Sequence, residues 1–283
     1  MNKILLLTFL LVPIILIGCS SVKSTDVLNF VLPSGGYDKQ QIDYSIIDRQ
    51  GIDIYLPKTT IKKTPIVFVY GGAWRDGSKE DYEFVAHALT GLGHPVIIPD
   101  YRLYPQVRFP AFIDDIAKAI KHVEDNADKY LNESFDEYIL MGHSAGAHSA
   151  ALLATDRQYL RKYNLKAKLT GLIAMAGPYD LPLDDPEVKP VFAGVSENLS
   201  SPIMNIHPDL PPVLLFHGDA DDRVLPKHTR KFDKELKKAN LSVTTHIYPK
   251  ANHTQLIGSL AAPLRFLNDS YKDISTFLVD HKL

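Results

Sequence analysis

Cysteine is nearly absent from this chain. The 283 residues contain one, Cys19, so no intrachain disulfide can form. An excess of either charge is also lacking, because 31 Lys and Arg stand against 33 Asp and Glu, a formal net charge of −2. This balance gives no electrostatic footprint for nucleic acid, and we expect no such partner. The hydrophobic content of 45% is that of an ordinary globular protein, long enough for one sizeable core.

Long apolar runs are confined to the N-terminus. Ile4 to Ile17 follows Lys3 and is too short to span a bilayer comfortably, so it is typical of the apolar core of a signal peptide. The run ends in LIGC, which resembles the lipobox of bacterial lipoproteins. That resemblance implies cleavage after residue 18 and acylation of the Cys19 thiol. An uncleaved anchor helix, or ordinary secretion with a free thiol, are the alternatives.

The resemblance also implies a domain organisation and a location. Residues 1–18 form the lipoprotein signal peptide, 19–30 an acylated tether, and 31–283 one folded domain. Ser20 and Ser21 follow the cysteine without an aspartate, a pattern that in Gram-negative families permits sorting to the outer membrane. We therefore expect an exported bacterial lipoprotein, attached to the periplasmic side of the outer membrane or to the cell surface. The oligomeric state stays open.

Beyond the tether, strand-like and helix-like patterns alternate. Alternating polarity predicts an antiparallel edge hairpin over 41–48 and 51–57. Continuous apolar runs predict buried strands, and amphipathic runs predict helices. The strands are expected at 64–72, 94–101, 137–142, 169–177, 211–218 and 243–249, and the helices at 80–93, 109–130, 225–240 and 262–283. This order predicts a doubly wound α/β fold, with functional groups at the carboxyl ends of the strands.

One such strand end carries Gly142-His143-Ser144-Ala145-Gly146, which fits G-x-S-x-G. A strand precedes the motif and a run of small residues, AHSAALLAT, follows it. This is the setting of a nucleophile elbow, in which a tight turn exposes the serine and requires small neighbours. A packing turn with an incidental serine is the alternative interpretation.

A nucleophilic serine needs a base, and the chain has eleven histidines. Most of them fall inside predicted elements, beside the serine or just before the acid candidates. His253 follows the last predicted strand, where an imidazole can reach across to Ser144. We therefore expect His253 to be the base.

The segment FHGDADDRVLP supplies the acid candidates Asp219, Asp221 and Asp222 beyond another strand. Three clustered carboxylates cannot all be buried in charged form, so one is expected to face the imidazole while the others stay solvated. Spacing does not choose among them, and Asp180 after the preceding strand is an outside candidate.

An oxyanion requires preorganised N–H donors. One is expected from Ala145, the residue after the serine, and another from the loop in VYGGAW, where glycines allow close backbone approach. A plain glycine turn is the alternative for that loop.

These segments together resemble the α/β-hydrolase serine esterases, in particular the hormone-sensitive-lipase-like carboxylesterases and the feruloyl and acetylxylan esterases. The likeness runs from about Tyr44 to the C-terminus and rests on YGGAWRDGSK, PDYRLYPQVRFPAFIDD, GHSAG, HGDADDRVLP and NHTQL. It implies an eight-stranded, mostly parallel sheet with a small cap segment between Leu181 and Pro208. It also selects Asp221 as the acid.

The resemblance further implies oxyanion donors at Gly72 and Ala73 together with Ala145. It gives Asp100, Arg102 and Asp115 a structural role near the site. One position departs from the family: the histidine before the two glycines is Tyr70 here, which affects the geometry expected of the loop.

The implied activity is hydrolysis of carboxylic esters through an acyl-enzyme on Ser144, without metal or cofactor. The substrate is a small-molecule or glycan ester. An exopeptidase, amidase or formamidase using the same triad is one alternative. A catalytically inactive binding lipoprotein is another, supported only by Tyr70.

Overall fold

A computed structural model describes residues 24–283 except 31, 33–34 and 59–62. The strands are β1 (Tyr37–Asp43), β2 (Gly51–Pro57), β3 (Ile66–Val69), β4 (Val96–Pro99), β5 (Glu137–His143), β6 (Lys168–Met175), β7 (Val213–Gly218) and β8 (Val243–Tyr248). The main helices are α2 (Glu83–Thr90), α3 (Ala111–Asp125), α5 (Ala145–Thr155), α8 (Lys227–Lys238) and α10 (Ser270–Asp280). Shorter helical segments are α1 (Ser24–Phe30), η1 (Lys79–Tyr82), α4 (Ala127–Tyr130), α6 (Gln158–Lys162), α7 (Glu197–Ser200), η2 (Pro202–Asn205), α9 (His253–Gly258) and η3 (Ala262–Leu264).

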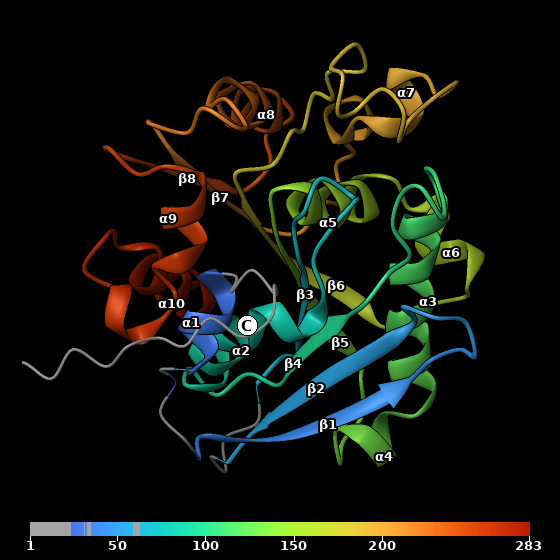
Figure 1. Ribbon diagram of the computed structural model, residues 1–283, viewed down its shortest axis with the longest axis vertical. Coiled ribbons are helices and arrows are strands. Elements are labelled where there is room, and N and C mark those ends of the chain that lie inside the picture. Colours follow the sequence, from blue (N-terminus) through green and yellow to red (C-terminus); the bar gives the residue numbers. More distant parts are fainter. Residues whose placement is uncertain (1–23, 31, 33–34, 59–62) are drawn as a thin grey trace, which may run out of the picture.

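The strands form one eight-stranded sheet in the order β1-β2-β4-β3-β5-β6-β7-β8. Only β1 and β2 run antiparallel to their neighbours, and all other pairs are parallel. Figure 1 shows helices on both sides of this sheet. The predicted doubly wound, mostly parallel α/β sheet is confirmed.

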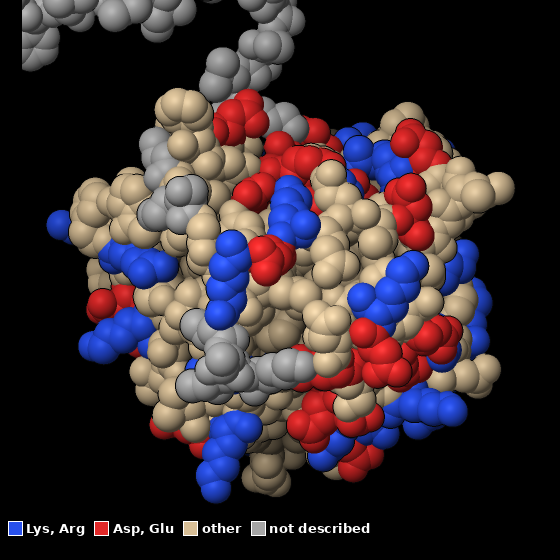
Figure 2. All heavy atoms as spheres, turned by 90° about the horizontal axis from the view of Figure 1, so that it is seen from below, with Lys and Arg blue, Asp and Glu red and all other residues tan. Residues whose placement is uncertain are grey.

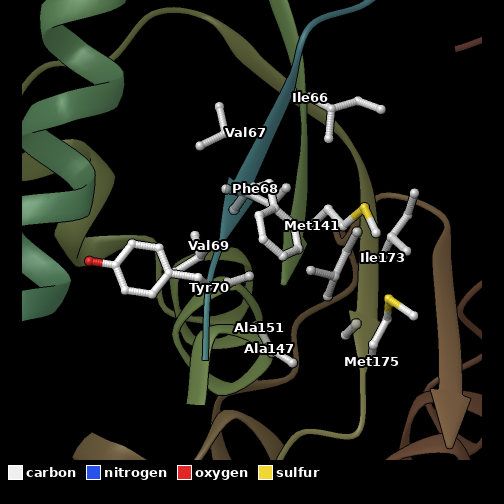
Figure 3. Packing of buried hydrophobic residues seen from close by; sticks show 14 of the residues in the cluster. Ile66, Val67, Phe68, Val69, Tyr70, Met141, Ala147, Ala151, Ile173 and Met175 are labelled. Carbon is white, nitrogen blue, oxygen red and sulfur yellow. The ribbon is translucent and has the colours of Figure 1, made fainter. Parts of the chain in front are cut away.

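The centre of the sheet is apolar because it is covered on both faces. All four residues of β3 are buried, and so are those of β4. Helix α5 packs on β3, β5 and β6 through small residues such as Ala147 and Ala151, so that the helix lies close to the strands (Figure 3). The outer strand β1 instead alternates between exposed and half-buried positions, as expected for a sheet edge. The rigid centre therefore carries the segments that lead into and out of the site.

The edge hairpin is shifted relative to its prediction. Strand β1 ends at Asp43, which pairs with Gly51, and not at residue 48. The Tyr44 N–H donates to the Gln50 carbonyl and closes the connection, and Ile46 is fully exposed there. Alternating polarity continues through 41–48, but the closed turn, which the pattern does not encode, ends the pairing.

The predicted C-terminal helix over 262–283 is also divided. Residues 262–264 form η3, and α10 begins at Ser270. The Asn268 side-chain oxygen accepts hydrogen bonds from the Ser270 N–H and the Ser259 hydroxyl. Such side-chain bonds to the backbone compete with helix formation, which explains the interruption.

At the N-terminus, residues 24–30 were expected to belong to the tether but form helix α1. The helix is held by Asn29, whose amide donates to the Glu80 carbonyl at 2.7 Å and whose oxygen accepts from the Phe84 N–H at 3.0 Å. Residues 1–18 and Cys19 lie outside the described residues. Among the described residues, no helix has the length and apolarity needed to cross a membrane.

Acidic and basic side chains are intermixed on the face shown in Figure 2. This agrees with the near balance of charges in the composition.

Candidate active site

Ser144 lies at the sharp turn between β5 and α5. Its φ of 57° and ψ of −124° are unusual for a residue with a side chain, as expected for a nucleophile elbow. A Cβ on Gly142 would lie 2.3 Å from the Gly146 carbonyl oxygen, and one on Gly146 would lie 2.0 Å from the Val69 oxygen. Gly142 is therefore required by the turn itself, and Gly146 by the close approach of α5 to the end of β3.

The loop after β3 approaches the serine closely. A Cβ on Gly71 would stand 2.9 Å from the Ser144 Cβ, so only glycine fits there. Gly72 has a φ of 124°, and its carbonyl accepts from the N–H groups of Arg75 and Asp76, which closes the loop. In the described part of the chain, the N–H groups of Gly72 and Ala73 donate to no other protein group. They are free to face a ligand at the elbow.

Ala145 supplies a third candidate donor. It is the first residue of α5, and the first N–H groups of a helix have no acceptor inside it. The three expected oxyanion donors thus come from two segments that meet at Ser144.

Tyr70 lies at the start of the candidate oxyanion loop, and its ring is close to Gly77 at the other end of that loop. Figure 3 shows its ring pointing away from Phe68 and Met141. Its hydroxyl donates to the buried Asp100 carboxylate at 2.7 Å, and its ring stacks on Tyr101 with centroids 4.6 Å apart. The position where the resembling family has a histidine is occupied here by a packed, hydrogen-bonded ring that holds the base of the loop.

The neighbouring block buttresses the same region. Arg102 donates through Nε and Nη2 to the two oxygens of the buried Asp115, each at 2.7 Å. Gln50 adds a further bond to Asp115, and the Lys79 N–H donates to Asp100 at 2.9 Å. Asp100, Arg102 and Asp115 therefore connect β2, the segment after β4 and α3, as a structural role requires.

His253 and Asp221 form a direct pair. The His253 Nδ1 lies 2.7 Å from the Asp221 Oδ2, and both side chains are buried. His253 follows the last strand, as expected. It is the first residue of α9, a helix that the sequence did not predict, and the oxygen of the preceding cap Asn252 accepts from the Gln255 N–H. The cap fixes where the helix begins and hence where the imidazole sits.

Asp221 is held at both oxygens. Oδ1 accepts from the N–H groups of Arg223 and Val224, at 3.0 and 2.9 Å. Burial alone would raise the pKa of this carboxyl, but hydrogen bonds from His217 and His253 outweigh it and lower the pKa. The group is thus an anion at neutral pH.

The other acid candidates lie elsewhere. Asp219 and Asp222 are exposed, and Asp219 accepts a hydrogen bond from the Lys250 N–H. Asp180 forms an ion pair with Lys231. Of the four carboxylates considered, the structure brings only Asp221 to His253.

Ser144 and His253 line one cavity of about 430 Å³. Among the described residues, no hydrogen bond joins their side chains. In unliganded enzymes such bonds are often long and tighten when substrate is bound. The arrangement therefore places a serine, a paired imidazole and free backbone donors around one space.

Two further histidines belong to this region, and their closeness to Ser144 and Asp221 in sequence is the one signal that could have pointed to them. His143 is buried with its ring 4.7 Å from that of His253, and its Nε2 bonds the His253 carbonyl oxygen. His217 contacts Asp221 Oδ2 through Nε2 at 3.3 Å. That nitrogen carries hydrogen because it also faces the Val224 carbonyl at 2.7 Å. His143 steadies the base and His217 the acid.

Ser144 also borders a smaller cavity of about 100 Å³, together with Trp74, Ala145 and Val188. The Trp74 ring packs edge-on against Phe192 and His148, at 4.9 and 5.1 Å. The segment expected to be a small cap therefore forms this wall. In the ranges that the structure covers, no cluster of three or more His, Cys, Asp or Glu could hold a metal ion.

The sheet order, the elbow at the end of β5 and the later histidine and aspartate define the α/β-hydrolase fold. More particularly, the BD-FAE family model matches residues 52–236, well over half of the chain, and the chain belongs to that family. The resemblance to α/β-hydrolase esterases drawn from the sequence is confirmed.

Curated relatives have esterase and formamidase names. A probable isoprenylcysteine alpha-carbonyl methylesterase of Arabidopsis thaliana is 26% identical over 86% of this chain and 56% of its own length. Esterase LipC of Mycobacterium tuberculosis is 26% identical over 76% of this chain and 59% of its own. A kynurenine formamidase of Salmo salar is 30% identical over 50% of this chain and 46% of its own. The chain thus spans about half to three-fifths of these relatives.

Solved structures share the fold. A truncated carbohydrate esterase from gut microbiota has a TM-score of 0.73 at 21% identity, covering 88% of this chain and 98% of its own. Thermogutta terrifontis esterase 2, phosphoramylated by tabun, has a TM-score of 0.71 at 22% identity, covering 88% and 96%. At these identities the likeness concerns the fold.

Proposed function

We propose that this protein is a serine hydrolase that cleaves carboxylic esters through an acyl-enzyme on Ser144. The observation that carries the proposal is the His253–Asp221 pair at 2.7 Å, opening on the same cavity as Ser144. Asp221 orients the imidazole and stabilises it when it is charged. Esterase names among the relatives support the same reaction class.

The reaction follows from the placed groups. The Ser144 Oγ attacks the ester carbonyl while the His253 Nε2 takes its proton, and the C–O bond to the alcohol breaks as His253 returns that proton to the leaving oxygen. Water then attacks the acyl-enzyme with the same histidine as base, releasing the acid and free serine. The N–H groups of Gly72, Ala73 and Ala145 hold the negative oxygen of each tetrahedral intermediate.

A fluorophosphonate probe tests the proposal directly. Labelling of the wild-type chain at Ser144, abolished in Ser144→Ala, is the expected result, together with loss of p-nitrophenyl acetate hydrolysis. Ser149→Ala, one turn along α5, is the matched control and should keep labelling. An unlabelled wild-type chain would instead favour the inactive binding protein.

An amide or formamide substrate is the second candidate. The observation that favours it is the formamidase relative, which matches half of this chain at 30% identity. A panel of small-molecule esters, acetylated sugars and feruloyl esters, with an anilide and an N-formyl amine, separates the two reaction classes. Higher kcat/KM on the N-formyl amine than on every ester would replace the ester proposal.

We also propose that the chain is a lipoprotein anchored through Cys19 to a bacterial membrane on the exported side. The lipobox-like LIGC supports this. Since α1 begins at Ser24, five residues after Cys19 (24 − 19), an extended chain of that length would reach no further than about 18 Å. The domain would therefore stay close to the membrane surface.

Fractionation of cells that express the wild-type chain and Cys19→Ala tests the anchor. We expect the wild type in the membrane fraction and the variant in the soluble exported fraction. Identical fractionation of the two would contradict acylation at Cys19.

A further inference from the structure

Helix α1 lies beside the candidate active site, and Asn29 is one of the side chains that hold it there. Asn29 receives the Phe84 N–H, one of the first N–H groups of α2, and donates to the Glu80 carbonyl of η1. Asn29 therefore acts as an N-cap for α2, although it lies far from that helix in the sequence. The usual N-cap is the residue that directly precedes the helix. The bonds of Asn29 help to fix α1 against η1 and α2, the elements that it contacts (Figure 1).

The docked helix contributes two side chains to the larger cavity. Thr25 and Leu28 line it together with Ser144, His253 and Ile257. Leu28 packs against the main hydrophobic core, while Val27 on the same helix is 54% exposed. One face of α1 is thus a wall of the space in front of the serine, and another faces solvent.

The chemistry of the histidine tells which part of an ester lies in that space. His253 must protonate the leaving oxygen, so the alcohol part leaves on the side of the imidazole. The larger cavity has His253 and Thr254 in its wall, whereas the smaller one has Trp74, Ala145 and Val188 and no contact with the imidazole. The alcohol therefore belongs with α1 and the acyl group with the cap segment.

We infer that α1 is a specificity-determining wall for the alcohol part of the substrate, with Leu28 as its central residue. The inference rests on the ester hydrolysis proposed above. The alcohol that fits is large and partly polar, because a cavity of about 430 Å³ combines Leu28 and Ile257 with the charged Asp76, while Arg223 borders both cavities. The acyl side, at about 100 Å³, accepts a small group.

Two substrate series measured on purified protein test this assignment. One series holds the acetyl group constant and enlarges the alcohol from methyl to cyclohexyl to a disaccharide, and the other holds methyl constant and lengthens the acyl chain. Leu28→Trp should lower kcat/KM for the bulkiest acetate relative to methyl acetate by about tenfold, a size typical of steric discrimination in a pocket. Its selectivity along the acyl series should match the wild type.

Matched variants complete the test. Val27→Trp places the same bulk on the exposed side of α1 and should leave both series unchanged. Val188→Trp should lower kcat/KM for the longer acyl chains relative to the shortest one. Its relative kcat/KM values along the alcohol series should equal those of the wild type. Leu28→Ala keeps the test valid where Leu28→Trp does not fold, because it should raise the relative kcat/KM for the bulkiest alcohol.

The outcomes separate the two proposals. A wild-type chain that hydrolyses no ester in either series overturns the proposed function. A wild-type chain that is active, with Leu28 variants whose alcohol selectivity equals that of Val27→Trp, leaves the function intact and overturns the role of α1. Equal effects of Leu28→Trp on both series would also overturn it, because the wall would then not be specific to the alcohol.

Discussion

The Nε2 of His143 hydrogen-bonds the backbone carbonyl oxygen of His253 at 3.2 Å. The residue before the candidate nucleophile therefore holds the residue proposed as its base, across 110 positions of sequence. Both rings are buried, and burial with the neighbouring His253 keeps the pKa of His143 well below its usual range, so His143 acts as a neutral donor. This hydrogen bond joins the segment of Ser144 to His253, and it includes neither the Ser144 Oγ nor the His253 Nε2, the two atoms of the proposed proton transfer.

This link predicts a role for His143 in positioning. Removing the donor in His143→Leu should lower kcat by about tenfold with little change in KM, since a misplaced base slows the chemical step. His143→Gln keeps a donor of similar reach and should recover part of the rate. Steady-state kinetics with p-nitrophenyl acetate measure both. Equal kcat values for the two variants would show that the hydrogen bond is unimportant.

The acid assignment predicts a large difference between neighbouring aspartates. Asp221→Asn keeps the shape of the side chain but removes the charge that orients and stabilises the imidazole, and kcat should fall by about 10³–10⁴. Asp219→Asn, two residues away and exposed, is the matched control and should stay within twofold of wild type. Both are measured by the same esterase assay. A large loss in Asp219→Asn alone would move the acid to that residue.

The hydrogen bond from Tyr70 to Asp100 should stabilise the folded chain. Tyr70→Phe removes the hydroxyl bond to the buried Asp100 carboxylate and leaves the bond from the Lys79 N–H, which should cost about 1.5–3 kcal/mol of unfolding free energy. Tyr101→Phe is the matched control, because it removes a bond to the neutral Tyr70 carbonyl and should cost about 1 kcal/mol. Urea unfolding at pH 7 compares the two. A smaller cost for Tyr70→Phe would contradict the proposed support of the loop.

The same variant has a predicted pH dependence. Burial raises the pKa of Asp100, and the Tyr70 hydroxyl partly offsets this, so in Tyr70→Phe the pKa should rise further. A carboxyl whose folded pKa lies above its unfolded value of about 3.8 destabilises the fold as pH rises and it ionises. The cost of Tyr70→Phe should therefore be smaller at pH 4 than at pH 7. A cost independent of pH would show that Asp100 does not titrate in this range.

We expect the buried His148 imidazole to make the folded chain less stable at acid pH. Burial lowers its pKa from 6.5 to about 4, and its Nε2 donates to the Ser200 carbonyl at 2.7 Å. Between these two pH values the unfolded chain binds a proton that the folded chain does not, so stability falls as pH falls, by about 1.4 kcal/mol per pH unit for this group. His148→Gln should flatten the slope of unfolding free energy between pH 6.5 and pH 4 by that amount. Identical slopes in the variant and the wild type would contradict the assignment.

Local patterns were sufficient for the sheet and for the elbow. The residues of β3 and residues 138–141 of β5 are apolar because both faces of those strands are covered, and this pattern predicts buried parallel strands. Gly142 follows from the tightness of the turn, which is a local property, whereas Gly146 is needed because α5 lies against the end of β3. Ser144 and His253 could both be chosen from the sequence because each follows a strand, and parallel strands bring their carboxyl ends to one edge.

What only the tertiary structure decided depends on contacts between distant segments. Spacing cannot rank the three carboxylates beyond β7, and the sequence selected Asp221 only through the family resemblance. The fold gives the physical reason, because it turns Asp221 toward His253 and leaves Asp219 exposed. The sequence also cannot show that Asn29 caps a helix more than fifty positions away. Nor can it show that Leu28 and Ser144 line the same cavity. A hydrogen bond or a cavity wall needs two atoms at a set distance, and the sequence order of the segments does not contain that distance.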